Sequence, residues 1–79
     1  MPEIVRLTNS KICMYADDHL PPHFHLRGPG WQASVDLTTL AVTAGRVPRR
    51  DLEEALRWVR VAENRALLSF EWRRLNERD

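Results

Sequence analysis

All three histidines of this 79-residue chain lie in one short segment, residues 17–25, which also holds two acids and two adjacent prolines. The segment reads Asp-Asp-His-Leu-Pro-Pro-His-Phe-His. Histidine is the side chain that most readily exchanges a proton near neutral pH, and its neutral imidazole is the commonest metal ligand in proteins. Chemistry is therefore expected first in this segment.

A divalent metal ion is the first kind of ligand that the segment could hold. His23 and His25 are two positions apart, so on a β-strand their side chains share a face and lie roughly 6.5 Å apart. His19 or Asp18, from the preceding loop, could complete the coordination of an ion such as zinc. The two prolines would stiffen that loop and reduce the entropy lost on binding.

Metal-free acid–base chemistry is a second interpretation, and it needs no cofactor. His23 or His25 would act as the general acid or base. Arg27 would stabilise a developing phosphoryl charge, and the hydroxyl of Tyr15 would position the substrate. Small metal-free ribonucleases use residues of these types, so an enzyme of this kind would act on RNA.

Three further residues are expected to contribute to binding. Arg49 and Arg50 come just before a predicted helix, whose first N–H groups favour anions. Asp36 shares the predicted sheet face of the histidines.

A third interpretation of the 17–25 segment is structural: its acids would accept backbone N–H bonds in a turn, and its imidazoles would bond to neighbouring strands. The residues alone leave the three interpretations open.

The elements that would position these residues are a sheet followed by helices. β-Biased stretches separated by turn residues predict strands at 4–7, 11–16, 23–27, 31–37 and, more briefly, 41–43. Asp51 and Glu54 have the spacing of a capping box, which predicts a helix start at Asp51, and Asn64 marks a break or a second cap. The chain is thus predicted to be a single α+β domain over residues 1–79. An antiparallel sheet of four to five short strands (1–45) would precede one kinked or two C-terminal helices (48–77) packed on one sheet face.

Strand alternation assigns the two faces of this sheet. Phe24 and Leu26 would face the helices, which puts His23, His25 and Arg27 on the opposite face. The same alternation adds further polar or small side chains to that face: Gln32, Ser34, Asp36, Cys13 and Tyr15. The predicted site is therefore one edge of an open polar sheet face.

Composition narrows the class of protein. A net charge of +1 gives no general electrostatic case for nucleic-acid binding, and a single cysteine excludes an internal disulfide. No apolar run approaches the roughly 20 residues that span a bilayer, and the first residues lack the pattern of a secretion signal. We therefore expect a cytoplasmic protein that does not contact membranes. A domain this small often needs a metal or a partner for stability.

Several short motifs accompany the 17–25 segment: Met1-Pro2-Glu3-Ile4, Met14-Tyr15, Asp36, Leu40, Gly45, Pro48-Arg49-Arg50 and Trp58. Together they resemble a family of small bacterial proteins known as domain of unknown function 4160. The resemblance identifies no catalytic residue. Members often lie beside a second small gene in units similar to toxin–antitoxin modules, which implies a small cognate protein encoded nearby as partner.

The function expected from residues and resemblance together is that of a toxin-like component. Its polar histidine and arginine face would act on RNA or on the cognate protein. The alternative is a divalent-metal-binding interaction module without catalytic activity. A homodimer formed through the C-terminal helices is a further expected association.

Overall fold

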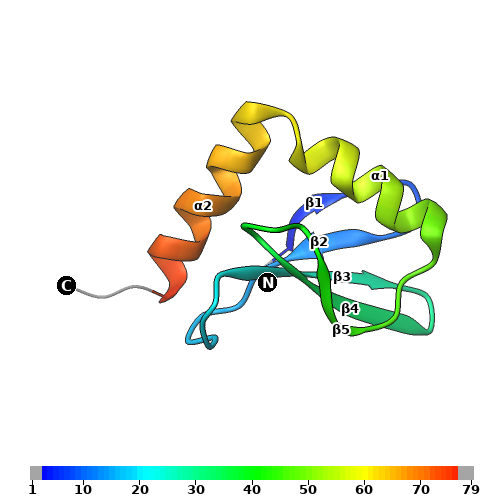
Figure 1. Ribbon diagram of the computed structural model, residues 1–79, viewed down its shortest axis with the longest axis horizontal. Helices are drawn as coiled ribbons and strands as arrows, with labels where there is room; N and C mark the ends of the chain where they lie inside the picture. Colours follow the sequence, from blue (N-terminus) through cyan, green and yellow to red (C-terminus); the bar gives the residue numbers. More distant parts are fainter. Residues whose placement is uncertain (1–2, 77–79) are drawn as a thin grey trace.

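The computed structural model describes residues 3–76, which form five strands and two helices (Figure 1). The strands are β1 (Glu3–Arg6), β2 (Lys11–Cys13), β3 (His23–Gly28), β4 (Trp31–Asp36) and β5 (Val42–Gly45). The helices are α1 (Arg49–Val59) and α2 (Ala62–Asn76). The predicted α+β order is confirmed. Met1, Pro2 and the last residue of the predicted helical half, Glu77, lie outside the described residues.

The strands form one antiparallel sheet in which each strand pairs with its neighbour in sequence, in the order β1-β2-β3-β4-β5. The β3–β4 ladder runs from His23 opposite Asp36 to Gly28 opposite Trp31. Gly30 in the connecting turn has a φ of 74°, a conformation that glycine adopts without a steric penalty. This register puts His25 directly opposite Ser34.

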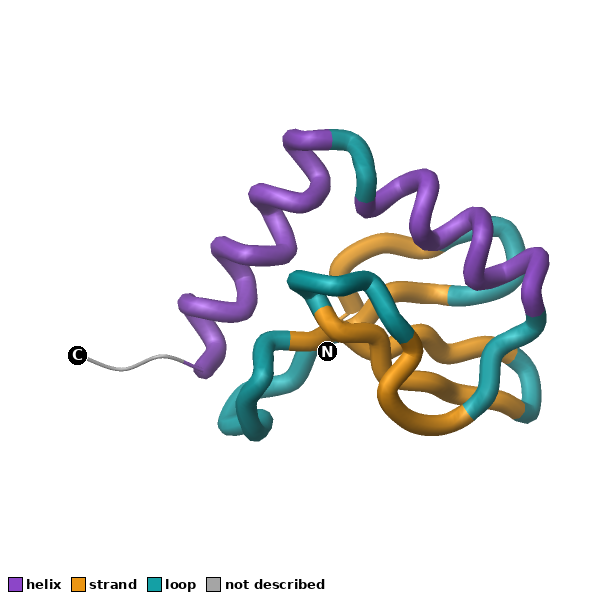
Figure 2. The backbone as a smooth tube through the Cα atoms, in the orientation of Figure 1, coloured by secondary structure: helices purple, strands orange, loops and turns teal. Residues whose placement is uncertain are grey.

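The core lies between one face of the sheet and the two helices. Phe24 and Leu26 are fully buried there, which confirms the predicted inner side of β3. The helices contribute four buried side chains to the same cluster: Ala55, Val59, Leu68 and Trp72. Figure 2 shows α1 crossing above the sheet, while α2 descends beside the end of the sheet. We call the sheet face opposite the helices the outer face.

Helix α1 begins earlier than the capping pattern predicts. Its first residue is Arg49, preceded by Pro48, and no side chain caps it. Glu54 instead accepts hydrogen bonds from the backbone N–H of Thr8 (3.2 Å) and from the Thr8 hydroxyl (2.6 Å). The capping-box prediction is therefore wrong, because Glu54 binds the β1–β2 turn instead of the end of its own helix.

The break between the helices lies at Arg60 and Val61, and the prediction of a break at Asn64 is wrong. Asn64 lies inside α2, where its side-chain amide donates to the carbonyl of Trp58 (2.9 Å). Carbonyls at the end of a helix lack partners within the helix. Asn64 therefore links the beginning of α2 to the end of α1.

The chain leaves the sheet after Cys13, earlier than the predicted 11–16 strand, and the following loop brings the Asp18 carboxylate over the histidines of the outer face. The loop contains a left-handed residue, Asp17 (φ 59°). The backbone N–H of Asp18 donates to Oδ1 of Asn76, at the end of α2 (2.6 Å). His23 is consequently 5% exposed and Cys13 is fully buried. The prediction of an open face is thus wrong at this end of the sheet, because the loop covers it.

Within residues 3–76, neither helix has the length and apolar content needed to cross a bilayer.

Candidate metal centre

Three side chains of the 17–25 segment converge on one point: Asp18 from the loop, and His23 and His25 from β3. The Nε2 atoms of both imidazoles lie 3.0 Å from the same carboxylate oxygen, Oδ2 of Asp18. The ligand-type atoms of the three residues all lie within 4.8 Å of one another. We call this set the Asp-His-His cluster. Alternation along β3 puts both imidazoles on the outer face, and the folded loop brings the carboxylate over them.

The second nitrogen of each imidazole faces an oxygen that fixes the ring. Nδ1 of His23 lies 2.8 Å from the carbonyl oxygen of Pro21. A carbonyl can only accept a hydrogen bond, so this Nδ1 carries the proton and donates it. Nδ1 of His25 lies 3.4 Å from the hydroxyl of Ser34, its cross-strand partner. Both rings therefore direct Nε2 at Asp18.

The electrostatics of the cluster favour a charged carboxylate. Burial by itself would raise the pKa of the Asp18 carboxyl. Hydrogen bonds from the His25 ring and from the backbone N–H of His19, with the neighbouring charge of His23 and His25, outweigh burial and lower this pKa below its usual value. Asp18 is therefore an anion in the folded protein at neutral pH.

Aromatic rings border the cluster on two sides. The ring of Trp72, from α2, lies 5.2 Å from the ring of His23. The ring of Tyr15 meets that of His25 edge-on at 4.8 Å. The side chain of His23 is 6% exposed and that of His25 is 25% exposed. Solvent consequently reaches the cluster mainly from the side of His25, and the apolar wall strengthens the electrostatic interactions inside it.

Two hollows on the outer face lie beside the cluster. One, of about 330 Å³, is lined by Tyr15, His25 and Ser34 among others. The second, of about 240 Å³, is lined by His19, His23 and Ser34 among others. Ser34 borders both hollows, so they are neighbours on this face; the first touches His25 and the second touches His23.

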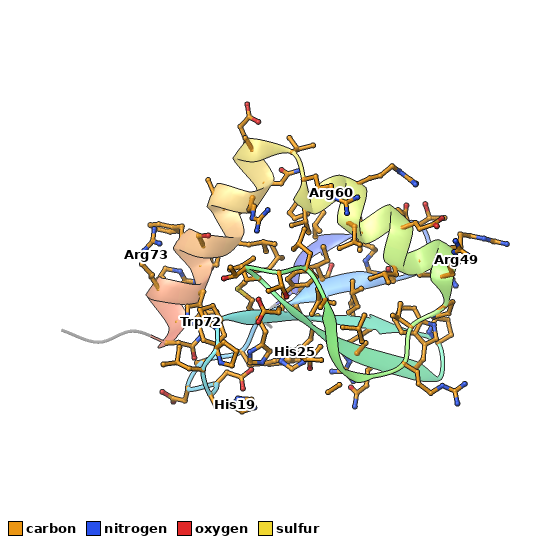
Figure 3. The ribbon with its side chains drawn as sticks, viewed as in Figure 1. His19, His25, Arg49, Arg60, Trp72 and Arg73 are labelled. Atoms are coloured by element: carbon orange, nitrogen blue, oxygen red, sulfur yellow. The ribbon has the colours of Figure 1, made fainter. Side chains whose placement is uncertain are left out.

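His19 lies at the rim and outside the Asp-His-His cluster. Its side chain is 85% exposed, and its Nε2 is 4.0 Å from Oδ1 of Asp18. Its Nδ1 faces the carbonyl of Leu20 (3.2 Å), and its ring stacks on that of His23. In Figure 3 His19 is at the lower border of the molecule, and His25 lies against the sheet. Three of the four predicted metal ligands therefore converge, and His19 stays apart.

Arg27 and Tyr15 are brought together as a pair next to the cluster. The guanidinium of Arg27 donates to the hydroxyl of Tyr15 (3.0 Å), and Arg27 is exposed. Asp36 has a different role. Its carboxylate accepts the backbone N–H groups of Thr38 (2.7 Å) and Thr39 (2.9 Å), which lower its pKa and hold the turn before β5.

Arg49 and Arg50 lie away from the histidines. They are the first residues of α1 and do not precede it as predicted. Arg49 pairs with Glu53 one turn along the helix (3.3 Å), and Figure 3 shows it at the opposite end of the molecule from Trp72. Arg50 lines a separate hollow of about 620 Å³ together with Glu54. Neither arginine therefore contributes to the Asp-His-His cluster.

Sequence reasoning missed two contributors to the cluster's surroundings: the Pro21 carbonyl and the Trp72 ring. It placed Ser34 on the face of the histidines but did not pair it with His25, a contact that the β3–β4 register through Gly28 to Gly30 could have indicated. The only signal at Trp72 is the apolar spacing of its helix, which is typical of a core residue. Trp72 is indeed a core residue, with 2% of its surface exposed.

The fold and the site define a small α+β domain with two histidines and one carboxylate clustered on a five-stranded sheet. The family model described as "Domain of unknown function (DUF4160)" matches residues 10–73. The chain belongs to this family, and the match includes the whole Asp-His-His cluster. No curated protein and no solved structure matches the chain.

Proposed function

We propose that this domain binds a divalent transition-metal ion through Asp18, His23 and His25. The observation that carries the proposal is the approach of two imidazole Nε2 atoms to one carboxylate oxygen at 3.0 Å. Neutral imidazole and carboxylate are ligands of zinc and of related metals. Two histidines with one carboxylate also form the three-ligand set of many iron(II) centres.

The orientation of His23 supports a cation at this point. Its Nδ1 donates a proton to the carbonyl of Pro21, which leaves Nε2 as the ring atom that faces Oδ2 of Asp18. Two acceptors 3.0 Å apart repel each other unless a proton or a metal ion lies between them. Histidine ligands commonly donate their second N–H to a backbone carbonyl, as His23 does, because that bond fixes the ring for coordination.

The spacing of the cluster is compatible with a single ion. Metal bonds of about 2.0–2.1 Å place the ligand atoms of a tetrahedral site about 3.3 Å apart. The three atoms here lie within 4.8 Å of one another, so side-chain movements that shorten the longest separation by about 1.5 Å suffice. Three protein ligands leave coordination positions for water or for a ligand in the adjoining hollows.

Metal analysis of protein purified without a histidine tag tests this proposal. We expect about one equivalent of metal per chain, lost in a His23→Ala/His25→Ala variant and retained in His19→Ala, which changes a histidine outside the cluster. Thermal unfolding with and without a chelator provides a second readout. Absence of metal in the wild type together with an unchanged melting temperature in zinc would refute the proposal.

A second candidate function is that of a toxin-like component in the cytoplasm, acting on RNA or on a small cognate protein. Two observations favour it. The Arg27–Tyr15 pair puts a cation and a phenol next to the cluster. The exposed side chains of Leu67 (40%) and Phe70 (54%) give α2 an apolar surface that a cognate protein or a second copy could cover.

Expression in a bacterial host tests this second function. We expect growth inhibition by the wild type, and relief of that inhibition by the His23→Ala/His25→Ala change. Co-expression with the product of the neighbouring gene should restore growth and yield a complex on purification. Equal growth of cells that express either version would contradict a role of the histidines in toxicity.

A further inference from the structure

Three basic side chains form a row across three neighbouring strands of the outer face. Arg6 in β1 is directly opposite Lys11 in β2, and Lys11 is directly opposite Arg27 in β3. Directly opposed residues of antiparallel strands project from the same face. Arg27 shares its face with His25, so the row lies on the same side of the sheet as the Asp-His-His cluster. We call these three residues the basic row.

The basic row lines a hollow of about 270 Å³, together with the β1–β2 turn. Ser10 belongs to the same lining and is 6% exposed. Its buried hydroxyl has no hydrogen-bond partner among residues 3–76. The hollow is therefore lined by three cations and by the polar turn that joins β1 to β2.

Folding alone does not account for the basic row. Like charges on directly opposed residues repel each other and lower the stability of a sheet. Glu3 offsets part of the charge, at 3.2 Å from Arg6 and 4.0 Å from Lys11. The Arg27 guanidinium donates to the phenol hydroxyl of Tyr15, which carries no negative charge to offset it. The hollow therefore keeps an excess of positive charge, which an anion would neutralise.

The basic row adjoins the Asp-His-His cluster. Arg27 and His25 are two residues apart on β3, which is about 7 Å. Tyr15 contacts both, because its hydroxyl accepts from Arg27 at 3.0 Å and its ring lies 4.8 Å from that of His25. A ligand on this face would therefore meet cations, then an aromatic ring, then the cluster.

We infer that the basic row binds the phosphates of a single-stranded nucleic acid. The row crosses two inter-strand spacings, about 10 Å, so its cations can contact successive phosphates of one strand. Cations that follow a backbone next to an aromatic ring are the usual arrangement for single strands, whereas an acidic peptide would make no use of the ring. The inference rests on the second function proposed above and narrows its ligand to nucleic acid.

Fluorescence anisotropy with a labelled 12-nucleotide RNA, measured over a series of salt concentrations, tests the inference. Three phosphate contacts predict a slope of about −2 for log affinity against log salt. The Lys11→Gln/Arg27→Gln variant should bind at least about tenfold more weakly, with a slope shallower by about 1.4. Arg6→Gln, at a side chain that is 72% exposed, repeats the test without disturbing the middle of the sheet.

Arg60→Gln is the matched control, because it removes one charge from an exposed site at the end of α1, far from His25 in Figure 3. It should bind RNA as the wild type does. Equal weakening in Arg60→Gln and in the basic-row variants would overturn the inference, as would unchanged binding by the basic-row variants. The inference would also be overturned if the wild-type protein bound RNA no more tightly than it binds polyglutamate. Single-stranded DNA in parallel reports whether the 2′-hydroxyl contributes.

Metal content measured on the same samples separates this inference from the proposals above. The basic-row variants should keep their metal, and the His23→Ala/His25→Ala variant should lose metal but keep its salt-dependent binding of RNA. A variant that loses metal but still binds RNA therefore tests only the metal proposal for the Asp-His-His cluster, and leaves the inference about the basic row standing. RNA binding without any toxicity in cells would remove the toxin-like function and leave the nucleic-acid site intact.

Discussion

Replacing Asp18 with asparagine removes the negative charge of the Asp-His-His cluster with little change of shape. Four-ligand structural zinc sites carry about 10–16 kcal/mol of binding free energy, or about 3 kcal/mol for each ligand. Asp18 is the anionic ligand among the three, with both imidazoles 3.0 Å from it. At about 1.4 kcal/mol for each factor of ten, its loss should weaken metal binding about a hundredfold.

Thermal unfolding converts this change of affinity into a measurable shift. Metal at about 100 times its Kd stabilises the folded state by about 2.7 kcal/mol. In a domain of this size each kcal/mol moves Tm by about 4–8 °C, so the wild type should gain about 10–20 °C. That concentration of metal equals the Kd of the Asp18→Asn variant. The variant is therefore stabilised by only about 0.4 kcal/mol, and its Tm should rise by about 2–3 °C.

The assay compares melting curves of tag-free protein after treatment with a chelator, with and without added zinc. His19→Ala is the control, because His19 lies in the same segment but outside the cluster. It should keep the full shift in zinc. A full shift in Asp18→Asn, or an equal loss of shift in His19→Ala, would show that the ligands are not the three residues of the cluster.

Three further predictions concern the scaffold and its dependence on pH. Glu54→Ala removes both hydrogen bonds to Thr8 and should lower Tm by about 4–8 °C. Glu53→Ala, at an exposed helical pair, should change stability by less than about 0.5 kcal/mol, and thermal unfolding of both variants checks this. Phe24→Ala leaves a cavity at a fully buried position and should lower the free energy of unfolding by about 3–5 kcal/mol. This loss is enough to unfold much of the protein at 37 °C, which circular dichroism would reveal. The carboxyl of Asp36 has a pKa below its ordinary value of 3.8, because backbone N–H groups of the following turn bind its charged form. Its stabilising contribution is thus present above the unfolded-state pKa and is lost as pH falls through the folded-state pKa. The difference in urea midpoint between wild type and Asp36→Ala should therefore shrink as the pH is lowered from neutrality to below 3.8, and a constant difference would contradict this origin.

Much of the fold could be predicted because it depends on near neighbours in sequence. Alternation along residues 23–28 separates Phe24 from His23 and His25, whatever the rest of the chain does. The apolar spacing of the helical half likewise places Leu68 and Trp72 on one face, and both are buried. The predictions that failed involve distant partners. Glu54 has the spacing of a capping residue, yet it binds Thr8, which is 46 positions away.

The candidate site divides in the same way. The sequence alone determined that His23 and His25 share a strand face with Arg27, because side chains on a strand alternate. Only the tertiary structure decided that Asp18 joins them and His19 does not. The path of the loop depends on contacts such as the bond from Asp18 to Asn76, 58 positions along the chain. The basic row likewise required the pairing of three strands, which no local pattern specifies.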